Sequence, residues 1–272
     1  MQYITLNNGV KMPNIGLGTY GLKGQKGIEI MQSALHIGYR LIDTAQMYEN
    51  EKEVGVALVM QKDLIRPLQR NNFFITTKLS SNMPYKKAWQ SIEQSLQNLG
   101  LEYVDLLLIH ESYANVKEMY KACEEAYHKG LVRAIGISNF YGKFLEDFLN
   151  SVQIVPVLNQ VQAHIFFQQR TLQKLLESKD IHLQAWSPLA CGRNNIFTNA
   201  TLQSIAKNYH KSTAQIALKF LLDKGMSVIP KASNFERLQE NLMLFDFSLT
   251  QQERDSITRL DTNKSLFGWD CY

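Results

Sequence analysis

The chain contains little that suggests a disulfide framework, a metal site or a membrane segment. Only three of its 272 residues are cysteines, at positions 123, 191 and 271, and their spacing matches neither paired disulfides nor thiolate ligands. No apolar run approaches the roughly 20 residues of a membrane-spanning helix, and the first residues do not form a basic-then-apolar leader. These absences favour a cytoplasmic protein with no metal and no membrane partner.

A concentration of charge is also missing. The formal net charge is +4, and the basic residues are spread along the chain instead of gathering with aromatic residues. This distribution argues against a nucleic-acid surface, although a slight positive balance helps to capture a small anionic ligand. No linker rich in proline, glycine or serine divides the chain, so we expect one domain over residues 1–272.

What the chain does contain is an alternation of strand-like and helix-like segments. The pair Asn8-Gly9 predicts a two-residue turn in an N-terminal β-hairpin. Eight apolar runs follow, at residues 15–19, 40–45, 73–79, 104–110, 134–140, 155–161, 182–188 and 226–232. Helical patterns separate the runs, and extra helices are predicted near residues 199–209 and after Thr250. Continuous apolar runs are typical of buried parallel strands, so we predict an α/β fold, a (β/α)8 TIM barrel.

Residues 16–21 suggest an alternative α/β fold. Their sequence, GLGTYG, matches the G-x-G-x-x-G pattern of dinucleotide-binding open sheets. In those sheets the pattern opens a helix at once, whereas two further glycines here delay the predicted helix to about residue 25. We therefore favour a glycine-rich loop after the first strand, at the mouth of a barrel.

Polar side chains stand where three successive strands are predicted to end. Asp43 ends the second strand, Tyr48 follows it, Lys78 ends the third strand, and His110 ends the fourth. Each residue alone has an ordinary structural explanation, such as a helix cap, a packed ring, a surface charge or a core histidine. Because the strands of a parallel barrel end at the same rim, we expect the four side chains to meet there.

A tyrosine beside a lysine indicates a proton-donating site. The pKa of free tyrosine is about 10, and a neighbouring buried cation lowers it by favouring the phenolate. Lys78 can be that cation, Asp43 can hold it, and His110 can bind a substrate carbonyl oxygen. An alternative is that Lys78 forms a Schiff base, as in barrel aldolases.

Three long segments resemble the signature motifs of the aldo-keto reductases, at residues 38–55, 131–140 and 228–241. The resemblance covers nearly the whole chain and is nearest to small bacterial members such as 2,5-diketo-gluconate reductase. It implies a monomeric barrel that reduces aldehydes and small ketones with NADPH, or less well with NADH. It also implies that Asp43, Tyr48, Lys78 and His110 form the catalytic tetrad, with Tyr48 as the proton donor. Some barrels of this family instead accompany ion channels as poorly active subunits, but the intact tetrad here favours an enzyme.

The resemblance also assigns a cofactor site. The matching positions are Thr19, Ser138, Asn139, Gln160 and Trp186 for the nicotinamide, Ser187 and Leu189 for the pyrophosphate, Lys231 and Arg237 for the 2′-phosphate, and Glu240 and Asn241 for the adenine.

Substrate recognition shows the clearest departures from the family pattern. A pocket wall of Tyr20, Tyr48, His110 and Trp269 is implied, and the short C-terminal tail predicts an open pocket. Glu111-Ser112 replaces a common Trp-Pro pair, which alters that wall. Ala232 replaces a serine or threonine that commonly helps to hold the 2′-phosphate, which weakens the expected preference for NADPH.

Overall fold

An eight-stranded parallel sheet forms the centre of the computed structural model, which describes residues 2–59 and 69–268. Each strand pairs with the next one along the chain, so neighbours in sequence are neighbours in the sheet. The strands are β3 (Leu17–Gly18), β4 (Leu41–Asp43), β5 (Phe74–Leu79), β6 (Leu106–Ile109), β7 (Ile135–Ser138), β8 (Leu158–Gln162), β9 (His182–Trp186) and β10 (Ser227–Val228).

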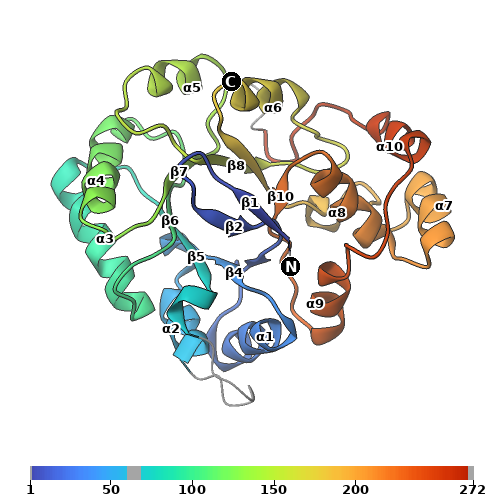
Figure 1. Ribbon diagram of the computed structural model, residues 1–272, viewed down its shortest axis with the longest axis horizontal. Helices are drawn as coiled ribbons and strands as arrows, with labels where there is room; N and C mark the ends of the chain where they lie inside the picture. The colour runs from blue at the N-terminus through green and yellow to red at the C-terminus, as the bar shows by residue number, and fades with distance from the viewer. Residues whose placement is uncertain (1, 60–68, 269–272) are drawn as a thin grey trace.

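The sheet curls until its two ends meet. A parallel bridge joins Ile15 to Val228, and the amide of Gly16 donates to the carbonyl oxygen of Val228 at 2.9 Å. The amide of Gly18 reaches the carbonyl oxygen of Pro230 at 3.2 Å. These contacts close the ring of strands seen in Figure 1, so the (β/α)8 barrel predicted from the apolar runs is confirmed.

Helices cover the outside of the sheet, and most of them follow a strand (Figure 1). In chain order they are α1 (Gly24–Ile37), α2 (Glu51–Val59), α3 (Tyr85–Leu99), α4 (Val116–His128), α5 (Gly142–Leu149), α6 (Arg170–Glu177), α7 (Ala200–Tyr209), α8 (Thr213–Asp223), α9 (Phe235–Leu242) and α10 (Gln251–Thr258). The extra helices α7 and α10 lie where the sequence predicts them, and Thr250 caps α10 in a capping box with Glu253. Within residues 2–59 and 69–268 no helix is long and apolar enough to cross a bilayer.

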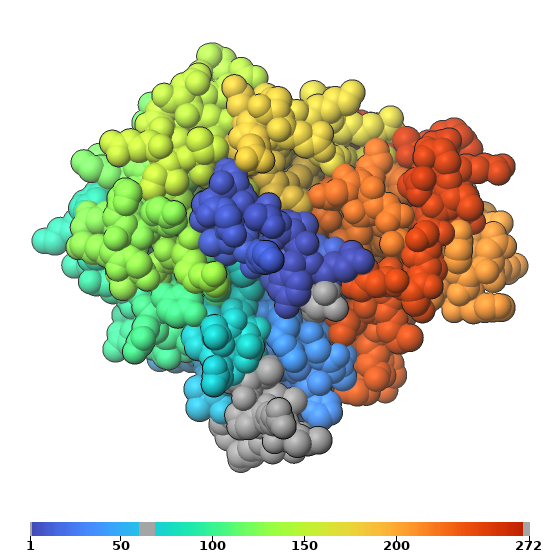
Figure 2. Space-filling model, viewed as in Figure 1, coloured from blue at the N-terminus to red at the C-terminus, as the bar shows by residue number. Residues whose placement is uncertain are grey.

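A β-hairpin of β1 (Tyr3–Thr5) and β2 (Lys11–Pro13) covers one end of the barrel. Asn7 donates to the carbonyl oxygens of Pro156 and Asp180, which precede β8 and β9, and Met12 is fully buried. In Figure 2 this dark-blue segment lies across the middle of the face. The hairpin therefore closes the end at which the strands begin, and the opposite end remains for a site.

The turn of the hairpin differs from the prediction. The amide of Leu6 donates to Val10 and that of Gly9 to Leu6, so three residues, 7–9, form the loop. A two-residue turn of the expected kind needs left-handed backbone at both central residues, but only Gly9 adopts it, with φ of 82°. The side chain of Asn8 instead accepts a hydrogen bond from Val10, which stabilises the longer loop.

The glycines of residues 16–21 serve the barrel rather than an open-sheet phosphate loop. A Cβ atom on Gly16 would lie 1.7 Å from Leu41, and one on Gly18 would lie 2.8 Å from the carbonyl oxygen of Ile229. Close approach of neighbouring strands thus requires glycine at both positions. The helix α1 begins only at Gly24, which agrees with the preference for a loop at the barrel mouth.

Candidate active site

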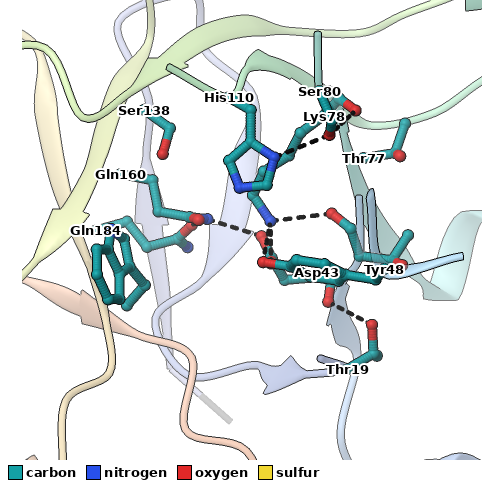
Figure 3. Close-up of polar contacts among 12 residues, drawn as sticks. Thr19, Asp43, Tyr48, Thr77, Lys78, Ser80, His110, Ser138, Gln160 and Gln184 are labelled. Atoms are coloured by element: carbon teal, nitrogen blue, oxygen red, sulfur yellow. Dashed lines mark hydrogen bonds and ion pairs between the residues drawn. The ribbon is translucent and has the colours of Figure 1, made fainter. Parts of the chain in front are cut away.

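The four polar residues at the predicted strand ends meet at one rim of the barrel (Figure 3). Asp43 is the last residue of β4, Lys78 lies one residue before the end of β5, and His110 directly follows β6. Tyr48 ends the short 3-10 helix η1 (Gln46–Tyr48), which continues from β4. The carboxyl ends of three adjacent strands therefore deliver a carboxylate, an ammonium, an imidazole and a phenol to the same place.

Lys78 is the centre of the cluster. Its Nζ lies 2.5 Å from Oδ1 of Asp43, 2.9 Å from the carbonyl oxygen of Thr44 and 3.4 Å from the hydroxyl of Tyr48. Lys78 has no exposed surface and Asp43 is 1% exposed, so this is a buried ion pair. The three contacts use all three N–H groups of the ammonium, which is how a buried lysine remains charged.

Both partners of the ion pair respond to their burial. Burial lowers the pKa of Lys78, but the charges and hydrogen bonds of Asp43 and Tyr48 outweigh this effect, and the net shift is upward. Burial raises the pKa of Asp43 by more than Lys78 and a hydrogen bond from Gln160 lower it, so its net shift is also upward. The upward shift of Lys78 means that its ammonium keeps its charge at neutral pH.

The pKa of Tyr48 moves in the direction opposite to the prediction. Burial raises it, and the attraction of Lys78 for the phenolate opposes burial without overcoming it. Asp43 adds a smaller repulsion that also favours the protonated phenol. Tyr48 consequently keeps its proton at neutral pH, next to a cation that can stabilise the phenolate once the proton has left.

His110 is held as a neutral imidazole. Burial, helped by the nearby Lys78 charge, lowers its pKa to about 3. Its Nδ1 lies 2.9 Å from Oγ of Ser80, and the side chain of Asn139 donates to its backbone carbonyl oxygen at 3.1 Å. The His110 and Tyr48 rings meet edge to face, with centroids 5.9 Å apart, so both face the same small space.

Two amide side chains, the half-buried Gln46 and the buried Asn50, fix the segment that carries Tyr48. Gln46 donates to the backbone and hydroxyl groups of Ser91 and to the hydroxyl of Ser95 on α3. Asn50, fully buried, accepts from the hydroxyl of Thr44 at 2.7 Å and donates to the carbonyl oxygen of Thr19 at 2.8 Å. The phenol is therefore positioned by one anchor at the start of η1 and another just after its end.

A chain of amides from β8 and β9, which are not neighbours of β4 in the sheet, supports Asp43. Nε2 of Gln160, on β8, donates to Oδ2 of Asp43 and to Oε1 of Gln184, both at 2.7 Å. The hydroxyl of Thr19 donates to the backbone oxygen of Asp43 at 3.0 Å. Both carboxylate oxygens of Asp43 are thus hydrogen-bonded, as a buried charge requires.

A long cavity of about 1140 Å³ opens above the cluster. Tyr48, His110 and Glu111 line one part of it, and Lys231 and Arg237 line another. The wall of the cavity also includes Thr19, Tyr20, Asp43, Met47, Asn139, Gln160, Trp186, Ser187, Leu189, Cys191, Phe267, Glu240 and Asn241. A volume of this size, with polar groups at separate points, suits an extended ligand such as a dinucleotide.

The middle of the cavity is shaped by Trp186 and the loop after it. The indole N–H of Trp186 donates to Oδ1 of Asn139 at 2.8 Å, which fixes the ring in the wall. Ser187, Ala190 and Cys191 all have left-handed backbone, with φ of 49°, 51° and 50°. Such backbone is unusual for residues other than glycine and recurs where a chain binds a ligand closely.

Two cations are available at the end formed by β10 and α9. Lys231 and Arg237 are exposed to the cavity, and neither forms an ion pair with a residue in the described part of the chain. Asn234 caps α9 by accepting from the amide of Arg237 at 2.9 Å, so a helix N-terminus also lies here. Cations and a helix N-terminus together fit the phosphate of a nucleotide cofactor.

The structure brings almost all of the predicted site residues to this cavity. Lys78 lies beneath the wall, and Ser138, 1% exposed, accepts a hydrogen bond from Asn139 behind it. Trp269, predicted for the substrate pocket, lies outside the described residues. Ser80 and Gln184 are not identified from the sequence, although Ser80 lies only two residues after Lys78, directly after the end of β5.

Three histidines provide a test of the fold through pH. Burial lowers the pKa of His110 to about 3. Burial is also the main reason why the pKa values of His164 and His182 are lowered to about 4. Each is neutral in the folded protein, so stability is full above the ordinary pKa of 6.5 and is lost as pH falls towards 4.

His182 isolates one of these contributions. Its Nε2 accepts from the amide of Ser227 at 3.1 Å, and a proton there would break the bond. We expect His182→Gln to reduce the slope of unfolding free energy against pH by up to about one proton between pH 6.5 and pH 4. Urea unfolding across this range measures the slope, with exposed His128→Gln as the control. An unchanged slope in His182→Gln would contradict the assignment.

Comparison with known proteins agrees with this geometry. The model of the aldo/keto reductase family matches residues 14–262. The chain is 39% identical to the 9,11-endoperoxide prostaglandin H2 reductase of Trypanosoma cruzi, over 97% of this chain and 93% of that protein. It is 37% identical to the glyoxal reductase of Bacillus subtilis, over 97% of this chain and 94% of that one.

Solved structures give the same result. An aldo-keto reductase, MGS-M4, from a Medee basin deep-sea metagenome library superposes with a TM-score of 0.92 and 38% identity, covering 97% of both chains. An aldo/keto reductase from Brucella melitensis superposes with a TM-score of 0.90 and 36% identity, covering 96% of this chain and 99% of that one. With barrel, rim cluster and family motifs in agreement, the chain belongs to the aldo/keto reductase family of carbonyl-reducing oxidoreductases.

Proposed function

We propose that the protein is an NADPH-dependent reductase of aldehydes and small ketones, with Tyr48 as the general acid. The observation that carries this proposal is the buried ammonium of Lys78, 2.5 Å from Asp43 and 3.4 Å from the Tyr48 hydroxyl. A phenol that keeps its proton beside a fixed cation can release that proton when negative charge develops on a nearby oxygen. The neighbouring neutral imidazole of His110 offers an N–H group to the same oxygen.

The residues of the chain divide the chemistry among themselves. His110 orients the carbonyl oxygen by a hydrogen bond, and Tyr48 transfers its hydroxyl proton to that oxygen as the C–O double bond becomes single. Lys78 then stabilises the Tyr48 phenolate, and Asp43 holds Lys78 in place before and after the proton is transferred. A reduced nicotinamide bound here would supply the hydride for the carbonyl carbon, so that the products would be an alcohol and an oxidised nicotinamide.

The lining of the cavity supports this cofactor. We propose that Asn139, Gln160 and Trp186 hold the nicotinamide near Tyr48, together with Thr19, which directly follows β3. The left-handed loop with Ser187 and Leu189 would hold the pyrophosphate. The remaining proposed contacts are Lys231 and Arg237 for the 2′-phosphate, Glu240 and Asn241 for the adenine, and Ser138 behind the nicotinamide wall.

Arg237 provides a direct test of the preference for NADPH. We expect Arg237→Ala to raise KM for NADPH about 10- to 100-fold, because hydrogen bonds to charged groups contribute about 1.5–3 kcal/mol. KM for NADH should stay nearly unchanged, since NADH has no 2′-phosphate. Ala232 is 2% exposed and has no hydroxyl, so the two basic side chains carry this recognition without its help.

Steady-state kinetics with both cofactors measures this difference. Arg259→Ala removes an exposed arginine at the end of α10 and serves as the matched control for lost charge. Equal increases in KM for NADPH and NADH after Arg237→Ala would show that Arg237 does not contact the 2′-phosphate.

We propose small neutral carbonyl compounds as the substrates. Glu111 lines the cavity beside His110 and has no ion-pair partner among residues 2–59 and 69–268, while the charge of Asp43 is compensated by Lys78. The substrate part of the cavity therefore carries a net negative charge that repels carboxylates. Similarity to the glyoxal reductase of Bacillus subtilis and the methylglyoxal reductase DkgA of Escherichia coli, 36% identical, supports small dicarbonyls.

A matched pair of substrates tests the role of Glu111. Glyoxal and glyoxylate differ in that a carboxylate replaces one aldehyde group. We expect Glu111→Gln to raise kcat/KM for glyoxylate several-fold and to leave kcat/KM for glyoxal nearly constant. Initial rates of NADPH consumption give both values, and exposed Glu102→Gln is the control. An unchanged ratio of the two values would contradict the charge-based preference.

A further inference from the structure

A hydroxyl group supports His110 from behind the cavity wall. Oγ of Ser80 lies 2.9 Å from Nδ1 of His110 and 3.2 Å from the carbonyl oxygen of Lys78 (Figure 3). Ser80 directly follows β5 and is half-buried, and the amide of Ser80 donates to the side chain of Gln46 at 3.3 Å. The hydroxyl is therefore held between the imidazole and the strand that carries Lys78.

The single hydrogen of this hydroxyl decides what His110 can do. If it is donated to Nδ1, the hydrogen of the neutral imidazole must lie on Nε2, where it can bind a carbonyl oxygen. If it is donated to the carbonyl oxygen of Lys78, Nδ1 can carry the hydrogen and donate to Ser80. Nε2 then carries a lone pair, which repels a carbonyl oxygen.

The carbonyl reduction proposed above requires the first arrangement, because only a hydrogen on Nε2 can be donated to the substrate oxygen. The 2.9 Å contact between Oγ and Nδ1 is short enough for Ser80 to donate there, although Oγ also lies 3.2 Å from the competing carbonyl oxygen of Lys78. The pKa of His110 is about 3, so near neutral pH the ring carries only one N–H and the choice of nitrogen is decisive. Asn139 holds the backbone oxygen of His110 and leaves ring orientation to Ser80.

We propose that Ser80 is a positioning residue that donates to Nδ1 of His110 and so keeps the imidazole hydrogen on Nε2, facing the substrate. This inference rests on the carbonyl reduction proposed above, because it explains how His110 becomes a donor to the substrate. Ser80 itself touches neither substrate nor cofactor and acts through the ring.

Nitrogen NMR of the imidazole tests the proposal without reference to activity. In protein labelled with 15N-histidine, the two ring nitrogens of His110 should show the hydrogen on Nε2 and a hydrogen-bonded lone pair on Nδ1. In Ser80→Ala we expect both resonances to shift towards a mixture of tautomers, and in Ser80→Thr, which keeps the hydroxyl, we expect the wild-type pattern. A hydrogen on Nδ1 in the wild-type protein would overturn the proposal.

Kinetics supplies the second readout. We expect kcat/KM for glyoxal to fall roughly fivefold in Ser80→Ala, as for the loss of one neutral hydrogen bond, and to recover in Ser80→Thr. Ser81→Ala, at the exposed neighbouring position, should change neither readout. Unchanged tautomer and kcat/KM in Ser80→Ala would overturn the role of Ser80. A wild-type protein that shows the Nε2 hydrogen but reduces no carbonyl would instead contradict the proposed function.

Discussion

Replacing Tyr48 by phenylalanine is expected to lower kcat for aldehyde reduction by about 10²- to 10⁴-fold. The change removes one oxygen, and with it the only phenol hydroxyl that contacts the Lys78 ammonium in the described structure. Without it the developing alkoxide loses the proton donor proposed above. The edge-to-face contact of the Tyr48 ring with His110 is kept, so the shape of the site should change little.

Cofactor binding separates this effect from general damage. NADPH affinity, measured by fluorescence titration, should remain within about twofold in Tyr48→Phe, because the lost hydroxyl is not among the groups proposed to bind the phosphates of the cofactor. Tyr3→Phe, on the exposed hairpin at the opposite end of the barrel, is the matched control and should retain full kcat. Retention of most of kcat in Tyr48→Phe would show that another group donates the proton.

Replacing Lys78 by methionine is expected to destabilise the protein by about 3–5 kcal/mol, as well as to remove most of the activity. The methionine fills a similar volume, but the carboxylate of Asp43, 1% exposed, loses its only cationic partner among the described residues. The hydrogen bond from Gln160 remains, yet an amide cannot compensate a buried charge as an ammonium does. Urea unfolding at neutral pH measures the loss.

The pH dependence of Lys78→Met follows from the same charge. Without Lys78, burial raises the pKa of Asp43 further above its unfolded value, so the penalty is present at high pH and is relieved as pH falls through the raised pKa. The stability difference from wild type should therefore shrink on acidification. The double variant Asp43→Asn/Lys78→Met, which removes both charges of this pair, should recover stability but not activity. A double variant no more stable than Lys78→Met would contradict this account of the ion pair.

The chain order of the barrel could be predicted because its strands are short, apolar and regularly spaced. The run over residues 106–109 is wholly apolar and is followed by His110, and a parallel strand buried on both faces explains both features. Once parallel neighbours are assumed, Asp43, Lys78 and His110 must share one rim. The meeting of the tetrad therefore follows from topology, and the distances of 2.5 Å and 3.4 Å around Lys78 agree with it.

Quantities that depend on packing could not be predicted. The presence of Lys78 indicates a lower pKa for Tyr48, but the opposing effect of burial depends on how deeply the rim is covered. The loop after Trp186 has left-handed backbone at Ser187 and Cys191, where no glycine marks it in the sequence. The predicted length of the hairpin turn was wrong by one residue, because the side chain of Asn8 stabilises the longer loop.

Transfer of deuterium from the cofactor tests the central claim most directly. Glyoxal is reduced with NADPH that carries deuterium at the transferable position of the nicotinamide, and the alcohol is analysed by mass spectrometry. We predict one deuterium on the former carbonyl carbon of each product molecule, and almost no product from Tyr48→Phe. Product without deuterium, or a glyoxal adduct trapped on Lys78 by borohydride, would contradict a site built for hydride transfer with proton donation by Tyr48.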